Sequence, residues 1–379
     1  MRIDPLLTQI QMQSGGSPGW LHRVPLDLPL LGGLAALSGI ALVVLYSASG
    51  QELDVLIRQS LRLLLAMGIM LAVAYVHPRF LYNITPILYM VAIVMLVLVL
   101  LIGKTSMGAQ RWLDLGIVRF QPSELMKIAT PMMLAWYLAR YAPPPSFKSF
   151  LVACALILLP VLLIAKQPDL GTAILVGSSG AAVIFLSGLS WAYLLGILAM
   201  GASALPLLWK MLHGYQRDRI LMLLNPEADP LGRGYHIIQS KIAIGSGGIG
   251  GKGWLHGTQV RLEFLPESST DFIFAVLAEE FGLVGCLGLL GAYFIILARC
   301  LYIVVRAKDR YSRYLAGALT LTFFVYIFVN ISMVIGILPV VGVPLPLVSY
   351  GGTSTVTLLA GFGILMSIQY HENISKRLK

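Results

Sequence analysis

The chain has 379 residues, of which 58% are hydrophobic and only 12% charged, and its net charge at pH 7 is +10. Soluble domains carry charge on about a quarter of their residues, so this composition excludes an ordinary soluble protein and predicts a multi-pass membrane protein. The basic excess could suit nucleic acid, but the positive-inside rule accounts for it, and we expect no nucleic-acid partner.

Long apolar runs recur from about residue 28 to 369 and predict an all-α integral membrane protein. A bilayer core of about 30 Å requires about 20 apolar residues per helix, so residues 26–370 are expected to form one domain of about ten transmembrane helices. Their approximate limits are 28–47, 60–76, 82–102, 122–139, 149–165, 169–188, 191–208, 271–297, 312–337 and 353–370. We expect cytoplasmic tails at 1–25 and 371–379, and a large outer loop, residues 210–270, between helices seven and eight.

Charge distribution orients this domain. Basic residues gather in segments such as 299–313 and 376–379, and the positive-inside rule therefore predicts an N-in, C-in topology. Of the 17 acidic residues, only Asp4, Asp27, Asp309 and Glu372 then fall on the cytoplasmic side. Asp and Glu contribute little to topology. Solvation of the outer loop explains some of the outer acids but not those at helix starts, which indicate a functional site at the outer face.

Several outward-facing helices begin with a cap or proline signal: QPSE at Pro122, QPD at Pro168, STD at Thr270 and GGTS at Thr353. Helix N-termini carry partial positive charge and free N–H groups, so their convergence suits an anion such as phosphate. The alternative is that each signal only starts its helix.

The stretch VRFQPSELMK, residues 118–127, contains the first candidate group. Glu124 and Lys127 are three residues apart on a helix and share a face, and each would be costly in the bilayer without the other. A purely structural ion pair is one interpretation. Arg119 and Gln121 lie just outside the same helix end, and two cations with an amide donor suit a diphosphate headgroup.

Two further segments flank predicted helix starts. In AKQPDLGT, Lys166 and Asp169 lie on either side of a proline, and Asp169 could either cap its helix or take part in a site. VPLPLVSYGGTS, residues 343–354, contains Ser349 and breaks an apolar region without charge. Such a break is tolerated at membrane depth when it lines protein or a cavity, so a re-entrant turn and a cavity wall are compatible interpretations.

The stretch LEFLPESSTDFIFAVLAEEFG contains five carboxylates around a predicted helix start. Asp271 lies at that start, and Glu279 and Glu280 follow about 12–14 Å further along a helix, too far to act on the same atom. Upstream, GSGGIGGKG resembles a phosphate-binding loop, but Gly253 follows the lysine where Ser or Thr is required. A mobile linker and a backbone that approaches a ligand remain the alternatives. The scattered Cys and His residues predict no metal site.

The motifs FQPSE, KQPDLGT, LEFLPESSTDFIFAVLAEE and PLPLVSYGGTS, in this order across the spans, resemble those of the SEDS (shape, elongation, division and sporulation) family. The resemblance covers nearly the whole chain. The run ISMVIGILPVVGVPLPLVSYGGTS is closer to the rod-shape branch of the family than to the division branch.

This resemblance implies a peptidoglycan glycosyltransferase that polymerises lipid II at the outer face of the bacterial inner membrane during wall elongation. It also implies a class B penicillin-binding protein and other elongasome proteins as partners. Asp271 would be the general base, and an outward-facing polar cavity beneath it would be lined by Arg119, Gln121, Glu124, Lys127, Lys166, Asp169, Glu263 and Ser349. No tightly bound cofactor is implied, although Mg²⁺ or Mn²⁺ could bridge the diphosphate.

Two other functions fit part of the pattern. Ten spans, a polar cavity and intramembrane charge also suit a lipid II flippase. A flippase, however, requires a polar path through the midplane to the cytoplasmic face, whereas these charges stop about halfway. A scaffold for the transpeptidase would leave the cavity charges unexplained.

Overall fold

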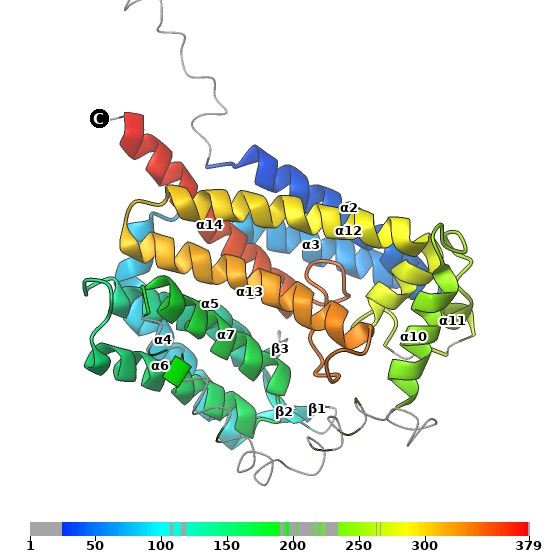
Figure 1. The fold of residues 1–379 in the computed structure, drawn as a ribbon, viewed down its shortest axis with the longest axis horizontal. Helices are drawn as coiled ribbons and strands as arrows, with labels where there is room; N and C mark the ends of the chain where they lie inside the picture. The colour runs from blue at the N-terminus through cyan, green and yellow to red at the C-terminus, as the bar shows by residue number, and fades with distance from the viewer. Residues whose placement is uncertain are drawn as a thin grey trace, which may run out of the picture.

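The computed structural model describes residues 25–106, 109–114, 119–189, 234–262, 264–265 and 267–377, with a few single positions between 193 and 223. It is built of helices that run between two ends of an elongated bundle (Figure 1). The helices are α2 (Leu28–Ala48), α3 (Leu53–Ala74), α4 (Pro78–Ile102), α5 (Pro122–Leu138), α6 (Phe147–Lys166), α7 (Leu170–Leu186), α10 (Tyr235–Gly247), α11 (Thr258–Arg261), α12 (Ile273–Arg306), α13 (Arg310–Val334) and α14 (Thr353–Arg377).

Seven of the described helices are long and apolar enough to cross a membrane: α2, α3, α4, α6, α12, α13 and α14. The helices α5 and α7 coincide with the predicted fourth and sixth spans but have 17 residues each. The predicted span 191–208 lies outside the described residues apart from single positions. A helical, multi-pass membrane domain is therefore confirmed, whereas the count of ten, the orientation and the outward cavity stay predictions.

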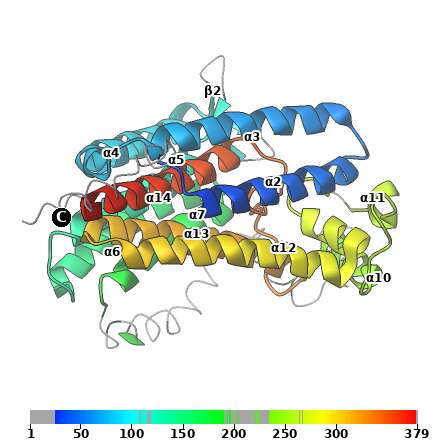
Figure 2. The same ribbon diagram turned by 90° about the horizontal axis from the view of Figure 1, so that it is seen from above.

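The buried centre of the bundle is formed by α13 and α14, whose apolar segments are 67% and 61% buried, against 22% for α3 and α6 at the periphery. α13 packs against α5, α7 and α12, and α14 packs against α3. The short helices α10 and α11 lie at the same end of the bundle as the start of α12 (Figures 1 and 2). This is the end that the sequence predicts to face outward.

The predicted helix starts were only partly right. Pro122 and Thr353 do begin α5 and α14. At QPD the cap is Asp169, whose carboxylate accepts the Thr172 N–H at 3.3 Å, rather than Pro168. At STD the helix begins two residues after Asp271, so Thr270 is not its cap.

A small antiparallel sheet connects α4 to α5 and was not predicted. Its strands are β1 (Lys104–Ser106), β2 (Ala109–Asp114) and β3 (Arg119–Phe120), in the order β1-β2-β3. β3 leads directly into Gln121, the N-cap residue of α5. The sheet therefore fixes where α5 begins.

Helix α12 is broken at Gly282, where φ is 63° and ψ is −158°. The segment 248–253 fills the break by exchanging backbone hydrogen bonds with it. Lys252 N donates to Glu279 O at 3.0 Å and Gly253 N to Glu280 O at 2.9 Å, while Leu283 N and Val284 N donate to the carbonyls of residues 248 and 249. These bonds pair the carbonyls of Glu279 and Glu280 and the N–H groups of Leu283 and Val284, and buried backbone groups require such partners.

Glycines allow this close approach of two backbones. A Cβ on Gly282 would lie 2.3 Å from Gly251 N, and one on Gly251 would lie 2.1 Å from Glu280 O. Gly251 and Gly282 also have positive φ, which L side chains rarely adopt. The segment GSGGIGGKG is therefore neither a phosphate loop nor a mobile linker, because its backbone completes a broken helix.

Candidate functional site

Asp271 lies at the outward-predicted end, two residues before α12, and is half-buried. Its carbonyl accepts a hydrogen bond at 3.0 Å from the Asn330 amide of α13. The preceding carbonyls are held as well, since Ser349 Oγ donates to Thr270 O at 2.6 Å and Tyr350 N donates to Ser269 O at 2.8 Å. The backbone that carries the Asp271 carboxylate is therefore fixed on two sides.

The segment between α13 and α14, which contains Ser349, connects Asp271 to the start of α7. A Cβ on Gly342 would lie 3.7 Å from Asp271 Oδ2, and a Cβ on Gly171 would lie 2.7 Å from Val341 O. Asn330 also donates to Val343 O at 2.8 Å, so one amide side chain holds both this segment and Asp271. The predicted re-entrant turn is thus a packed wall beside Asp271.

At the start of α7, the structure brings together Gln121 and Asp169, which were predicted from separate motifs. Gln121 Nε2 donates to Asp169 Oδ2 at 3.1 Å and to Ser123 Oγ at 3.0 Å. Arg111 of β2 approaches Asp169, with 3.9 Å between Nε and Oδ2, and donates to the Pro168 carbonyl. The N-termini of α5 and α7 are therefore cross-linked, and Asp169 is both a cap and a member of this group.

Glu124 and Lys127 form the predicted ion pair, with 2.5 Å between Glu124 Oε1 and Lys127 Nζ. Both residues are 5% exposed, and the Lys127 ammonium lies 5.1 Å from the centre of the Tyr326 ring on α13. Tyr326 is one helical turn before Asn330, which holds Asp271. The pair therefore supports the α13 surface on which the Asp271 segment rests.

Lys166 does not join these groups among the described residues, and two other predicted site residues lie outside the described part of the structure. Lys166 is exposed at the end of α6, and no hydrogen bond or ion pair joins it to the other described residues. Arg119 lies in β3, but its side chain is outside the described part of the structure, as is the whole of Glu263.

A large hollow of about 890 Å³ opens at the same end as Asp271. Ser268 and Ser269, which directly precede the Thr270–Asp271 pair, line it together with Tyr350, and two cations, Arg58 and Arg261, contribute as well. Its described lining does not include Gln121, Glu124, Lys127 or Asp169, which are buried. The prediction that these four residues line an open cavity is therefore not confirmed.

Glu279 and Glu280 hold the outer loop on the first half of α12. Glu279 Oε1 accepts the Lys252 ammonium at 2.6 Å and the Thr258 N–H and hydroxyl at 2.8 Å each. Glu280 accepts the hydroxyl of Ser47, at the end of α2. The two carboxylates are 0% and 1% exposed, so their described contacts are structural.

The comparisons with known proteins agree with the sequence motifs. The profile of the family described as Cell cycle protein, which covers FtsW, RodA and SpoVE, matches residues 28–374. The chain belongs to the FtsW/RodA/SpoVE family. It is 56% identical to the peptidoglycan glycosyltransferase MrdB of Escherichia coli K12, over 93% of this chain and 95% of MrdB. It is 33% identical to the peptidoglycan glycosyltransferase RodA of Treponema pallidum, over 90% and 97%.

Solved structures of related proteins have the same fold as this chain. The chain resembles one in a peptidoglycan synthase complex that coordinates polymerization and crosslinking, with a TM-score of 0.79, 34% identity and coverage of 91% of this chain and 98% of that one. The rod shape determining protein RodA of Thermus thermophilus has a TM-score of 0.70 at 30% identity, with coverage of 93% and 98%. These similarities place the chain in the rod-shape branch of the SEDS family.

Two residues of these groups, Asn330 and Arg111, were not predicted from the sequence. Asn330 is fully buried in a predicted membrane span, and an amide in such a position is a signal that could have identified it. Arg111 lies in a strand that was not predicted, so no local pattern pointed to it. Among the described residues, no group of three or more His, Cys, Asp or Glu side chains could hold a metal ion.

Proposed function

We propose that this chain is a peptidoglycan glycosyltransferase of the bacterial inner membrane that polymerises lipid II during lateral wall elongation and cell-shape maintenance. The 56% identity with MrdB over nearly the whole chain supports the reaction class. The assignment of the site rests on the hydrogen bonds that fix the backbone at Asp271. Asn330 holds the carbonyl of Asp271 and Ser349 holds that of Thr270, and the preceding Ser268 and Ser269 line a hollow of about 890 Å³.

Asp271 acts as the general base in this proposal. A donor with an α-linked sugar on a diphosphate gives a β-linked product only by inversion, so one carboxylate is sufficient. The acceptor 4-hydroxyl transfers its proton to Asp271 while its oxygen forms a bond to C1 of the donor. The bond from C1 to the diphosphate oxygen breaks, and the electron pair leaves with the diphosphate. A positioned base contributes about 10²- to 10⁴-fold to such a step.

Charge on the departing diphosphate requires nearby cations. Arg58 and Arg261 line the hollow and are our candidates for this role. Lys127 is buried and paired with Glu124, so we assign that pair a positioning role, exerted through Tyr326 and α13.

A class B penicillin-binding protein is the proposed partner, because a synthase complex that couples polymerization to crosslinking contains a chain of the same fold. A divalent cation would have to be held mainly by the diphosphate of the substrate, since the described carboxylates near Asp271 form no metal cluster. Asp169, for example, is engaged by Gln121 and Thr172.

Polymerisation of lipid II by the purified full chain, with and without the partner and Mg²⁺, tests the assignment. We expect Asp271→Asn to lower the rate about 10²- to 10⁴-fold, since the amide cannot accept the proton. Glu267→Gln is the matched control. It removes an exposed carboxylate of the same segment, whose described side-chain partner is the Thr270 hydroxyl, and we expect it to retain activity.

An Asp271→Asn protein that polymerised lipid II at the wild-type rate would remove Asp271 from the mechanism. Translocation of lipid II in liposomes by the wild-type chain, with no glycan polymer formed, would favour a flippase instead.

A further inference from the structure

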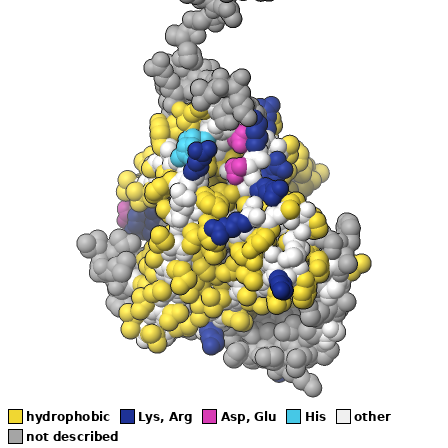
Figure 3. All heavy atoms as spheres, turned by 90° about the vertical axis from the view of Figure 1, so that its left-hand side faces the viewer, with side chains coloured by type: hydrophobic (Ala, Val, Ile, Leu, Met, Phe, Trp, Pro, Cys, Tyr) yellow, Lys and Arg dark blue, Asp and Glu magenta, His cyan; other side chains and the backbone are white. Residues whose placement is uncertain are grey.

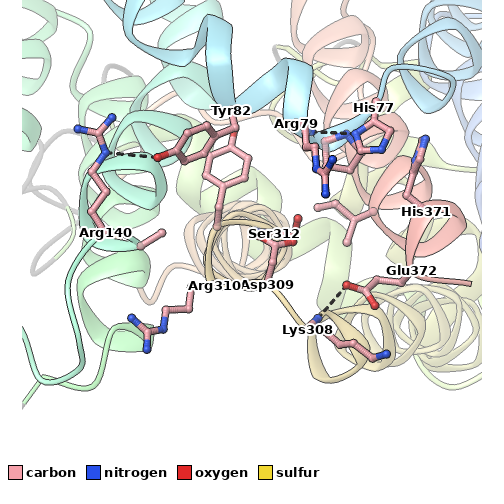
Figure 4. Close-up of a pocket in the computed structure, with 14 residues that line it drawn as sticks. His77, Arg79, Tyr82, Arg140, Lys308, Asp309, Arg310, Ser312, His371 and Glu372 are labelled. Atoms are coloured by element: carbon pink, nitrogen blue, oxygen red, sulfur yellow. Dashed lines mark hydrogen bonds between the residues drawn. The ribbon is translucent and has the colours of Figure 1, made fainter. Parts of the chain in front are cut away.

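A pocket at the opposite end of the bundle from Asp271 gathers basic side chains from several helices. It has a volume of about 660 Å³ and is lined by Arg79 near the start of α4, Arg140 just after α5, Lys308 and Arg310 at the α12–α13 turn, and His371 of α14, among others. In Figure 4, Arg79, Lys308 and His371 lie on one side and Arg140 and Arg310 on the other. The positive-inside rule explains cations at this end, but it does not explain why they surround a hollow.

The carboxylates of the pocket do not neutralise these cations. Asp309 accepts the Ser312 N–H at 2.9 Å and so caps α13, and Glu372 accepts the Lys308 N–H at 3.0 Å. Among the described residues, neither carboxylate lies within 4.0 Å of a cationic nitrogen of the pocket. Four Arg and Lys side chains line the pocket against these two carboxylates, so the pocket has an excess of positive charge.

Two of the cations are held in place by neighbouring groups. The Arg140 guanidinium stacks over the Trp136 ring, 3.3 Å from its centre, and Arg140 Nε donates to the Tyr82 hydroxyl at 3.3 Å. Arg310 Nη1 donates to the Tyr141 carbonyl at 2.9 Å. Each guanidinium has five N–H donors, so most of them remain available.

The other two cations, Arg79 and Lys308, are exposed. The side chains of Arg79 and Lys308 make no hydrogen bond, ion pair or ring contact with another residue in the described part of the chain. His77 and His371 lie beside them with 4.2 Å between their ring centres. Burial, together with the nearby His371 and Arg79, lowers the pKa of His77, which is consistent with a positive local field.

We propose that this pocket binds the phosphate of an anionic phospholipid headgroup. Guanidinium and ammonium groups bind phosphate through charge-assisted hydrogen bonds, and basic pockets between helices on the cytoplasmic side of a membrane suit such headgroups. The predicted orientation places the lipid in the inner leaflet.

The surroundings favour a lipid over a soluble phosphate. The pocket lies where α4 and α13 begin and where α12 ends, which is the level of the headgroups for helices that span the bilayer. Phe80, next to Arg79, is 56% exposed, and Val305, near Lys308, is 79% exposed. Figure 3 shows Lys, Arg and His side chains set among hydrophobic ones on this face of the molecule. Acyl chains can therefore lie beside the cations that hold the phosphate.

Native mass spectrometry of the purified full chain, titrated with phosphatidylglycerol or cardiolipin and with phosphatidylcholine, tests the proposal. We expect wild type to prefer the anionic lipids and Arg79→Gln/Lys308→Gln to bind them about 30-fold more weakly, since each cation near anionic lipid contributes a factor of about five. The control Lys148→Gln/Arg306→Gln removes two exposed cations from the same end, outside the pocket, and should bind like wild type.

Two results would overturn the proposal. One is that the pocket variant binds anionic lipid as tightly as wild type, or loses no more affinity than the control variant. The bound lipid would then surround the protein without using this pocket. The other is that inorganic phosphate stabilises lipid-free wild type but not the pocket variant, while wild type shows no preference for anionic lipid. The ligand would then be a soluble phosphate and not a lipid. The unfolding temperatures of the pocket and control variants are measured as well. If they equal that of wild type, a change in lipid affinity results from the lost charge and not from a change in folding.

Discussion

The two halves of α12 have different surroundings, although they are consecutive in sequence. Every residue from its N-cap Phe272 to Glu280 is buried. After Gly282, buried residues such as Leu289, Tyr293 and Ile296 alternate with exposed ones. A helix buried on all sides is enclosed by protein, whereas a helix with one buried stripe has a free face, which in a membrane lies against lipid.

This difference shows what the break at Gly282 separates. The first half is enclosed by α10, the segment 248–253 and the Glu279 contacts with α11, and it begins two residues after Asp271. The second half contacts α2 through Ile296, which lies against Gly33, and α13 through the Tyr293 ring, whose centre is 5.8 Å from that of Phe323. The first half of α12 therefore belongs to the assembly that positions Asp271, and the second half belongs to the helical bundle.

Substitution of the break residue should have the largest effect. Gly282→Ala places a Cβ at 2.3 Å from Gly251 N in a backbone conformation with φ of 63°. The conformation alone costs about 1–3 kcal/mol for a residue other than glycine. Loss of the backbone hydrogen bonds between α12 and the segment 248–253 adds to this cost. We expect a marked drop in thermal unfolding temperature and in lipid II polymerisation.

The second half of α12 provides the matched control. Gly288 is an exposed residue of the same helix, and a Cβ there meets nothing within 4 Å. Because Ala is favoured over Gly in a helix interior by about 0.5–1 kcal/mol, Gly288→Ala should match or exceed wild-type stability. A similar loss in both variants would contradict the division of α12 into two units.

Glu279→Gln should have the next largest effect. The neutral amide loses the ion pair with Lys252 and weakens the bonds from Thr258, and a hydrogen bond to a charged group contributes about 1.5–3 kcal/mol. We expect faster amide hydrogen exchange over residues 248–262 and lower activity. Unchanged exchange in that segment would show that the carboxylate does not hold the loop.

Much of the architecture could be predicted because it depends on local patterns. Span lengths follow from apolar runs, and the starts of α5 and α14 follow from Pro122 and Thr353. The Glu124–Lys127 pair follows from a spacing of three residues on a helix. The motifs were also sufficient to indicate the family.

The remainder depends on contacts between distant segments. The prediction placed Glu279 and Glu280 deep in a continuous helix, too far from Asp271 for the same chemistry. The chain instead breaks at Gly282, and the segment 248–253 returns to pair with the same turn. Hydrogen bonds between residues about thirty positions apart leave no periodic signal. The only local indication was the glycine content of both segments.

The smallest effect should come from Lys252→Met, which removes the cation from Glu279 but leaves the carboxylate. Glu279 keeps the Thr258 N–H and hydroxyl and the Gln259 N–H as donors, and the Lys252 side chain is 27% exposed, so water can replace part of the lost interaction. We expect a loss of about 1 kcal/mol, within the range of a single hydrogen bond, measured by thermal unfolding. If Lys252→Met instead destabilised the chain as much as Glu279→Gln, the ion pair rather than the loop amides would hold α11 on the first half of α12.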